Sequence, residues 1–85
     1  MEKSVFHQNY ALFLSCLRCA RKSAGLTQQE VAERLQQTQS FVSKCERGER
    51  RIDVIELLAF CQAIDISIED FIDQLKHILE QGKLE

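Results

Sequence analysis

Residues 27–48 decide the fold, and they have the sequence TQQEVAERLQQTQSFVSKCERG. Thr27 stands three residues before Glu30, which is the spacing of a capping box, where two side chains and two backbone N–H groups bond reciprocally at a helix start. Thr38 has a side chain that can cap a second helix, and Gly48 suits the C-terminal end of that helix. The stretch therefore predicts two short helices joined by a tight turn.

Apolar residues in both predicted helices recur at helical spacing. Val31, Ala32 and Leu35 share one face of the first helix. Val42 and Cys45, three residues apart, share one face of the second. We expect both of these faces to point into a common core.

The outer face of the second helix is polar and carries no carboxylate. Its stripe, at positions i, i+3, i+4 and i+7, consists of Ser40, Ser43, Lys44 and Arg47. Gln39 stands beside Ser40 at the N-terminal end. Amide side chains can bond the edge of adenine, and Lys or Arg can bond the edge of guanine. A solvated face is the simpler explanation for a single short helix, but the complete helix-turn-helix frame favours a surface that reads DNA.

The pattern resembles the Xre, Cro and phage-repressor family of helix-turn-helix regulators, over roughly residues 12–73. The matching positions are Gln28, Ala32, Val42-Ser43-Lys44, the apolar residue at 45 and Glu46-Arg47-Gly48, with Arg21 upstream and Leu57-Leu58-Ala59 downstream. The resemblance implies an all-α, lambda-repressor-like domain that binds DNA and regulates transcription.

The resemblance also implies roles for individual residues. Gln28 would touch a phosphate or brace the second motif helix, and Ala32 would let the two helices cross closely. Arg21 and Glu46 would form an internal ion pair. The positions that would face base edges are Gln39, Ser40, Ser43 and Lys44. The whole expected DNA-binding set is Gln28, Thr38, Gln39, Ser40, Ser43, Lys44, Arg47, Arg50 and Arg51.

One position departs from the family pattern. The family usually has Gly in the turn between the two helices, where this chain has Gln36. A non-Gly residue in the left-handed region costs on the order of 1 kcal/mol. We therefore expect a turn that is either mildly strained or slightly different in shape.

The charge of the chain is polarised along the sequence. Residues 1–52 hold nine Lys or Arg and five Asp or Glu, giving +4, and residues 53–85 hold two Lys and eight Asp or Glu, giving −6, so the total is −2. A field divided in this way can orient a molecule toward DNA despite an acidic total. Arg50 and Arg51, just past the second motif helix, are expected to bond backbone phosphates, and Arg18 and Lys22 are weaker candidates.

The remaining sequence predicts three further helices. One covers residues 7–23, with Phe13, Leu17, Ala20 and Ala24 on one face. Asp53 and Glu56 form a second capping box that opens a helix to about residue 63, whose mostly apolar surface includes Ile55, Leu58, Ala59 and Gln62. A last helix covers about residues 67–80. Five helices without a strand signal predict a single all-α domain over residues 1–85.

The last helix carries an apolar stripe over about three turns. Its members are Ile68, Phe71, Ile72, Leu75, Ile78 and Leu79. We expect this stripe to form the interface of a homodimer, which would bind an inverted-repeat operator with half-sites about 34 Å apart. In the alternative, the stripe folds back on the helix over residues 7–23 and contacts Phe6 and Phe13.

Other chemistries find little support in the sequence. Cys16 and Cys19 are only half of a zinc-binding pattern, and Cys45 and Cys61 fall on apolar helix faces, so we expect reduced thiols and no metal. No Gly-rich phosphate loop or nucleophile–His pair indicates an enzyme or a cofactor. Because no signal peptide and no apolar run of about 20 residues is present, we expect a cytoplasmic protein.

Two other functions remain open at this point. The chain could be the DNA-binding antitoxin of a toxin–antitoxin pair, with the acidic C-terminal half binding the toxin. It could also be a protein-interaction module that has lost DNA binding, although the polar stripe and the Arg50-Arg51 pair argue against this. The sequence does not separate repression from activation, nor a phage repressor from a restriction controller.

Overall fold

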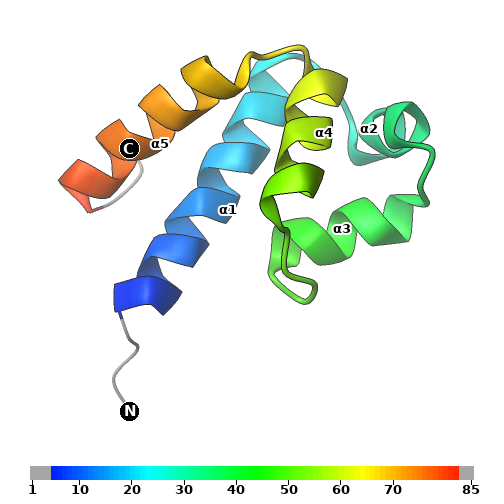
Figure 1. The fold of residues 1–85 in the computed structure, drawn as a ribbon. Coiled ribbons are helices and arrows are strands. Elements are labelled where there is room, and N and C mark those ends of the chain that lie inside the picture. The colour runs from blue at the N-terminus through cyan, green and yellow to red at the C-terminus, as the bar shows by residue number, and fades with distance from the viewer. Residues whose placement is uncertain (1–4, 83–85) are drawn as a thin grey trace.

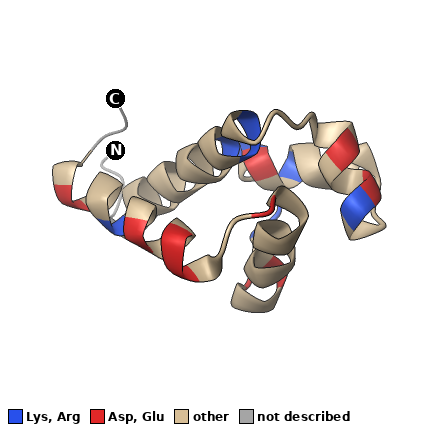
Figure 2. Ribbon diagram, turned by 90° about the horizontal axis from the view of Figure 1, so that it is seen from above, with Lys and Arg blue, Asp and Glu red and all other residues tan. Residues whose placement is uncertain are grey.

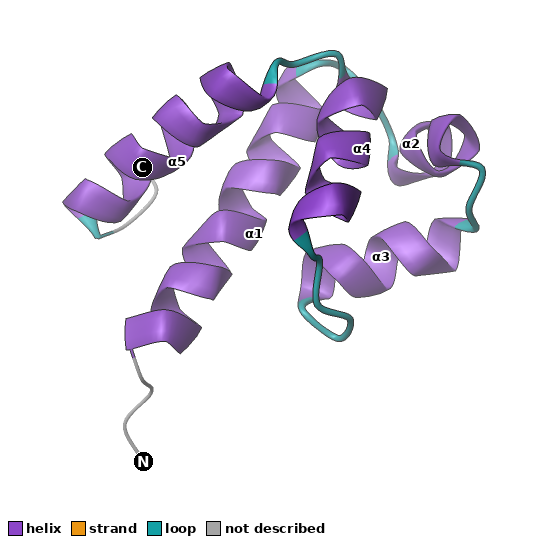
Figure 3. Ribbon diagram, viewed as in Figure 1, coloured by secondary structure: helices purple, strands orange, loops and turns teal. Residues whose placement is uncertain are grey.

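The computed structural model describes residues 5–82, which form five α-helices and no strand (Figure 1). The helices are α1 (Val5–Ser23), α2 (Gln28–Leu35), α3 (Gln39–Arg47), α4 (Val54–Ile64) and α5 (Ile68–Gln81). Short loops connect them (Figure 3). The predicted all-α class is confirmed.

Helix α1 runs through the middle of the molecule and separates α5 from the helix-turn-helix unit formed by α2 and α3 (Figure 1). It contacts α3 on one side and α5 on the other, while α4 packs against α2 and α5. Helices α2 and α3 also pack directly against each other. Contacts with α1 and α2 therefore hold the inner face of α3 and leave its outer face exposed.

The start of each helix from α2 to α5 is fixed by a side-chain cap. The N-cap residues Thr27, Thr38, Asp53 and Ser67 each accept a hydrogen bond from the backbone N–H three residues later. Thr27 and Asp53 complete the two predicted capping boxes with Glu30 and Glu56. Each N-cap contributes about 1 kcal/mol to helix stability, which explains why the sequence locates these boundaries well.

The turn between α2 and α3 has the backbone conformation that glycine favours, although this chain has Gln36 at that position. Gln36 adopts the left-handed region, with φ 58° and ψ 43°. Its backbone N–H points to the carbonyl oxygens of Ala32 and Glu33, so the end of α2 is closed as a helix C-cap. The turn therefore keeps its geometry, and the cost is the backbone strain of a non-Gly residue at positive φ.

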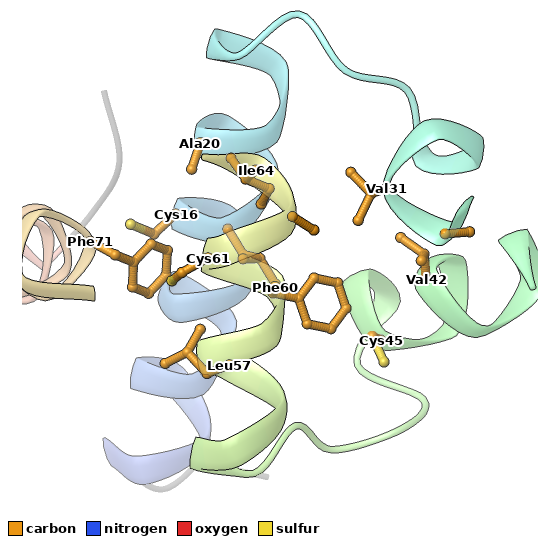
Figure 4. Packing of buried hydrophobic residues seen from close by; sticks show 13 residues of the cluster. Cys16, Ala20, Val31, Val42, Cys45, Leu57, Phe60, Cys61, Ile64 and Phe71 are labelled. Atoms are coloured by element: carbon orange, nitrogen blue, oxygen red, sulfur yellow. The ribbon is translucent and has the colours of Figure 1, made fainter. Parts of the chain in front are cut away.

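The core lies where all five helices meet (Figure 4). Val31 and Ala32 from α2 and Val42 and Cys45 from α3 are completely buried, as their spacing predicts. Phe60 of α4 packs toward α3, while Phe71 of α5 lies between Cys16 of α1 and Cys61 of α4. The larger set of core residues also includes Leu17, Ala20, Leu57, Ala63 and Ile64.

The residues through which α4 packs into the core are not those named from the sequence. Ile55, Leu58, Ala59 and Gln62 are exposed, whereas Leu57, Phe60, Cys61 and Ile64 form the buried face. The reason is that α4 has apolar residues on nearly all of its sides, so hydrophobic periodicity alone cannot identify the face that packs. Ala24, expected on the inner face of α1, lies beyond the end of that helix and is exposed.

Helix α5 folds back on α1, as the alternative interpretation expected. Phe71 is completely buried, and its ring meets Phe13 edge-on with 5.9 Å between the ring centroids. Phe6, the other expected contact, is exposed. Phe71 therefore belongs to the core of the single chain and is not available to a partner, which corrects its place in the expected dimer interface.

The remainder of the α5 stripe is only partly exposed. Ile68, Leu75 and Ile78 pack against the core, Leu79 is half-buried and Ile72 is the most exposed of the six. Across residues 5–82, no helix combines the length and the apolar character that a bilayer crossing requires.

Candidate nucleic-acid interface

The exposed face of α3 presents the polar side chains that the sequence predicts. Gln39, Ser40, Lys44 and Arg47 are exposed and Ser43 is partly so, while Val42 and Cys45 on the opposite face are fully buried. Thr38 caps the helix at the same end as Gln39. The expected base-reading residues therefore share one accessible surface.

A buried ion pair holds α3 against α1. The Arg21 Nε and Nη2 atoms donate to the two carboxylate oxygens of Glu46 at 2.7 Å and 3.0 Å, and Nη1 donates to the Leu26 carbonyl at 2.9 Å. The two side chains are 10% and 2% exposed. Bidentate pairing satisfies both charges in a site that water barely reaches, and it confirms the internal ion pair that the family resemblance implied.

A chain of amide hydrogen bonds extends from this pair to the outer face of α3. Gln28 Nε2 donates to Glu46 Oε1 at 3.0 Å, and Gln39 Nε2 donates to Gln28 Oε1 at 2.8 Å. Because a carboxylate only accepts hydrogen bonds, Glu46 determines which way both amides point. Gln28 is therefore a brace for the N-terminal end of α3, and the Gln39 amide is held in one orientation.

Arg18 supports the other end of α3. Its Nη1 atom donates to the backbone carbonyl of Glu46 at 2.8 Å, and Nη2 donates to Ser15 Oγ at 3.1 Å. A cation at the C-terminal end of a helix also interacts favourably with the helix dipole. Arg18 thus holds the helix in place, a role that differs from the phosphate contact considered for it, whereas Lys22 is exposed.

Arg47 is engaged by two neighbours at the C-terminal end of α3. Its Nε and Nη2 atoms donate to the Glu49 carboxylate at 2.9 Å and 3.2 Å, and Nη1 donates to Ser43 Oγ. The pairing raises the pKa of Arg47 and lowers the pKa of Glu49. Sequence analysis missed Glu49, although an acid two residues after Arg47 in a basic loop was a visible signal.

Arg50 is tied to the start of α4 instead of pointing freely outward. Its Nη2 atom lies 2.7 Å from Glu56 Oε2, and its guanidinium carbon lies 4.8 Å from the centre of the Phe41 ring. Hydrogen bonding with Arg50 is the main cause of the lowered pKa of Glu56. Arg50 therefore joins α3 to α4 in this structure, and its expected contact with a phosphate stays a prediction.

Arg51 lies on the exposed surface beside α1. Its guanidinium carbon is 4.1 Å from the centre of the Tyr10 ring, and the Tyr10 hydroxyl oxygen accepts a hydrogen bond from the Ile52 backbone N–H at 3.0 Å. Tyr10 thus anchors the loop and provides a surface for the Arg51 guanidinium. Neither contact of Tyr10 could be identified from the sequence, because Tyr10 lies 42 positions before Ile52.

Cys16, Cys45 and Cys61 are buried free thiols, whereas Cys19 is exposed. Burial raises the pKa of the Cys16 thiol to about 11, with smaller contributions from Cys19 and Cys61. Burial also raises the pKa values of Cys45 and Cys61. Buried protonated thiols act as small apolar side chains. Within residues 5–82, no group of three or more His, Cys, Asp or Glu side chains is arranged to hold a metal ion.

Charge is distributed unevenly over the fold. Acidic segments recur along α5 (Figure 2). Arg47, Arg50 and Arg51 follow one another at the end of α3, which lies across α1 from α5 (Figure 1). This agrees with the division of charge along the sequence and gives the α3 side the more positive field.

Comparisons with known proteins agree with this geometry. The helix-turn-helix family model matches residues 17–71. The structure of an XRE-family like protein from Pseudomonas syringae pv. tomato str. DC3000 is 42% identical, with a TM-score of 0.81, over 87% of this chain and 90% of that one.

Two further structures share the fold. The clp gene regulator ClgR from C. glutamicum is 27% identical with a TM-score of 0.68, over 82% of this chain and 88% of that one. A point mutant of the restriction-modification controller protein C.Esp1396I is 24% identical with a TM-score of 0.76, over 93% and 96% of the two chains, a likeness that concerns the fold alone. No curated protein sequence matches significantly. On its sequence, its fold and the polar face of α3, the chain belongs to the Xre family of helix-turn-helix DNA-binding transcriptional regulators.

Proposed function

We propose that the protein binds an inverted-repeat operator as a homodimer and reads each half-site with α3. The observation that carries the proposal is the chain of hydrogen bonds from Arg21 through Glu46 and Gln28 to Gln39. It fixes a hydrogen-bonding side chain on an exposed helix before any DNA is present. Such an arrangement lowers the entropy cost of ordering that side chain on binding.

Gln39 is the residue best placed for a defined base contact. One of its two amide hydrogens bonds Gln28, which leaves the second hydrogen and the carbonyl oxygen free for DNA. One donor and one acceptor on the same amide match N7 and N6 of adenine in the major groove. We therefore propose adenine as the base read by Gln39, and guanine as the base read by the exposed Lys44.

Phosphate contacts come from the edges of this surface. The Thr38 hydroxyl accepts a bond from the Phe41 backbone N–H, so its own hydrogen remains available to a phosphate oxygen. Arg51 is exposed, and stacking on Tyr10 does not use up its N–H donors. Such contacts fix the register of the protein on the duplex without carrying sequence information.

We infer that the dimer surface differs from the stripe expected on α5. Three apolar side chains are exposed on the first turns of α4, with exposed fractions of 66% for Val54, 69% for Ile55 and 39% for Leu58. Helix α4 follows α3 in the chain, whereas α5 lies across α1 from α3 (Figure 1). A two-fold axis beside the start of α4 keeps the two α3 helices close together, as adjacent half-sites require.

The first experiment is selection of random duplex DNA by the purified protein at about physiological salt, followed by sequencing. We expect enrichment of an inverted repeat with half-site centres about one helical turn apart. Enrichment of a single half-site would contradict dimeric reading. Absence of any binding would contradict the whole proposal and favour a protein-interaction role, for which the exposed acids along α5 would be the surface.

A matched pair of variants assigns the base contact. Gln39→Ala should remove the preference for adenine at one position of each half-site, at a cost of about 1–3 kcal/mol. The control is Gln29→Ala, because Gln29 is also an exposed glutamine but lies on α2 and bonds only Glu33 among the described residues. An unchanged sequence logo with the Gln39 variant would show that this amide does not read a base.

A further inference from the structure

The two ends of the α3 surface differ in how they are held. At the N-terminal end, Gln28 orients Gln39 and leaves part of its hydrogen-bonding capacity free. At the C-terminal end, the Arg47 guanidinium makes two hydrogen bonds to Glu49 and one to Ser43. The Gln39 amide at the first end therefore keeps hydrogen-bonding groups for DNA, while the Arg47 guanidinium at the second end already bonds groups of the protein itself.

The backbone of Glu49 is fixed by the C-terminal cap of α3. Gly48 takes the left-handed conformation, with φ 83°, and the backbone N–H of Glu49 donates to the Lys44 carbonyl at 2.9 Å. A Cβ atom on Gly48 would approach Leu14 Cδ1 to 3.2 Å, so the turn is also packed against α1. The C-cap of α3 therefore directs the Glu49 side chain back toward the end of the helix.

The Glu49 carboxylate occupies the hydrogen-bonding edge that Arg47 would use for DNA. A guanidinium binds a phosphate through two parallel N–H groups, and Glu49 takes two such groups, on Nε and Nη2. Both side chains are about half exposed, at 55% and 54%, and exposed ion pairs are weak. A phosphate group can therefore displace the carboxylate, but only in competition with it.

We propose that Glu49 is a built-in competitor for DNA phosphate at Arg47, which lowers the affinity of the protein for duplex DNA of any sequence. This inference rests on the proposed function, since it assumes that α3 faces DNA. A phosphate would bind the Nε and Nη2 groups that Glu49 now occupies, and the bond from Nη1 to Ser43 is compatible with this exchange because it uses neither group. Glu49 thus limits the access of phosphate to the C-terminal half of the α3 surface, while Gln28 orients Gln39 at the N-terminal half.

The test is a double-mutant cycle on binding to a duplex of random sequence, measured by fluorescence anisotropy at about 100 mM salt. Glu49→Gln should tighten binding about 5- to 10-fold in the wild-type background, because it frees one cation per subunit at a DNA-facing position. In the Arg47→Gln background the same change should tighten binding no more than about 2-fold, since the competition no longer exists. The charge-matched control, Glu69→Gln on the first turn of α5, should change binding less than 2-fold.

Other outcomes would overturn the inference. An equal gain from Glu49→Gln in both backgrounds would show that Glu49 repels DNA without competing for Arg47. An unchanged affinity, with a wild-type protein that binds DNA, would show that Glu49 lies away from the DNA. If neither the wild type nor any variant binds DNA, the proposed function fails together with the inference.

Discussion

At the scale of single residues, the position of α3 depends on one buried carboxylate. Glu46 accepts hydrogen bonds from Arg21 and Gln28, and its backbone carbonyl accepts one from Arg18. Side chains from α1 and α2 therefore meet on a single residue of α3. The same residue sets the position of the helix and, through Gln28, the orientation of Gln39.

Loss of Arg21 should be strongly destabilising. The change Arg21→Met leaves the Glu46 charge buried with only Gln28 as a side-chain partner, and breaking a buried pair in this way costs about 3–5 kcal/mol of unfolding free energy. The double variant Arg21→Met with Glu46→Leu should recover at least half of that loss, because no unpaired charge remains buried. Urea unfolding followed by circular dichroism measures both.

The double variant also separates stability from recognition. It should fold but lose the adenine preference assigned to Gln39, because Gln28 no longer has a carboxylate that fixes its amide. If the double variant is as unstable as the single one, the pair contributes through packing that Met and Leu cannot replace.

At the scale of helices, the ends were easier to predict than the faces. Thr27, Thr38 and Asp53 mark helix starts because capping depends on residues three positions apart. The packing face of α4 depends on where α1, α2 and α5 lie, which a helix that is apolar on nearly all sides does not reveal. The sequence therefore locates such a helix along the chain, but it does not identify the face that the helix buries.

The same difference explains which features of the candidate DNA-binding surface could be predicted. The face of α3 could be predicted because its residues lie three and four positions apart on one helix. The partners of Arg50 and Arg51 could not, because Glu56 and Tyr10 lie on other helices that meet the loop after α3 only in the fold. Charge counts therefore did not show which cations already have partners within the protein.

The turn between α2 and α3 should tolerate glycine better than its native residue. Gln36 has φ 58°, so Gln36→Gly removes steric strain and should raise the free energy of unfolding by up to about 1 kcal/mol. Thermal unfolding checks this. The opposite control is Gly48→Ala, which should destabilise, because φ is 83° and the new Cβ would meet Leu14. A lower melting temperature for Gln36→Gly would show that the glutamine side chain stabilises the turn.

At the scale of the whole molecule, charge and exposed apolar area divide the surface into regions. Arg47, Arg50 and Arg51 follow one another at the end of α3, α5 carries four of the eight acids of residues 53–85, and the start of α4 carries exposed Val54, Ile55 and Leu58. Apolar side chains grouped on neighbouring turns of one helix favour a protein contact over solvent. A dimer formed there turns the acids of α5 away from DNA, which suits binding by a chain of net negative charge.

Two single substitutions decide where the subunits meet. Ile55→Asp should shift the sedimentation coefficient from that of a dimer to that of a monomer, because it buries a charge at the centre of the proposed surface. Ile72→Asp, a change of the same kind at the most exposed position of the α5 stripe, should leave the dimer intact. Leu75 is unsuitable for this test, since it packs against the core and its replacement by Asp would also destabilise the fold. Because two linked half-sites bind far more tightly than one, the Ile55 variant should also lose most of its affinity for the inverted repeat while keeping its circular dichroism spectrum. Dissociation by Ile72→Asp alone would return the interface to α5 and would require a wider spacing between the two recognition helices.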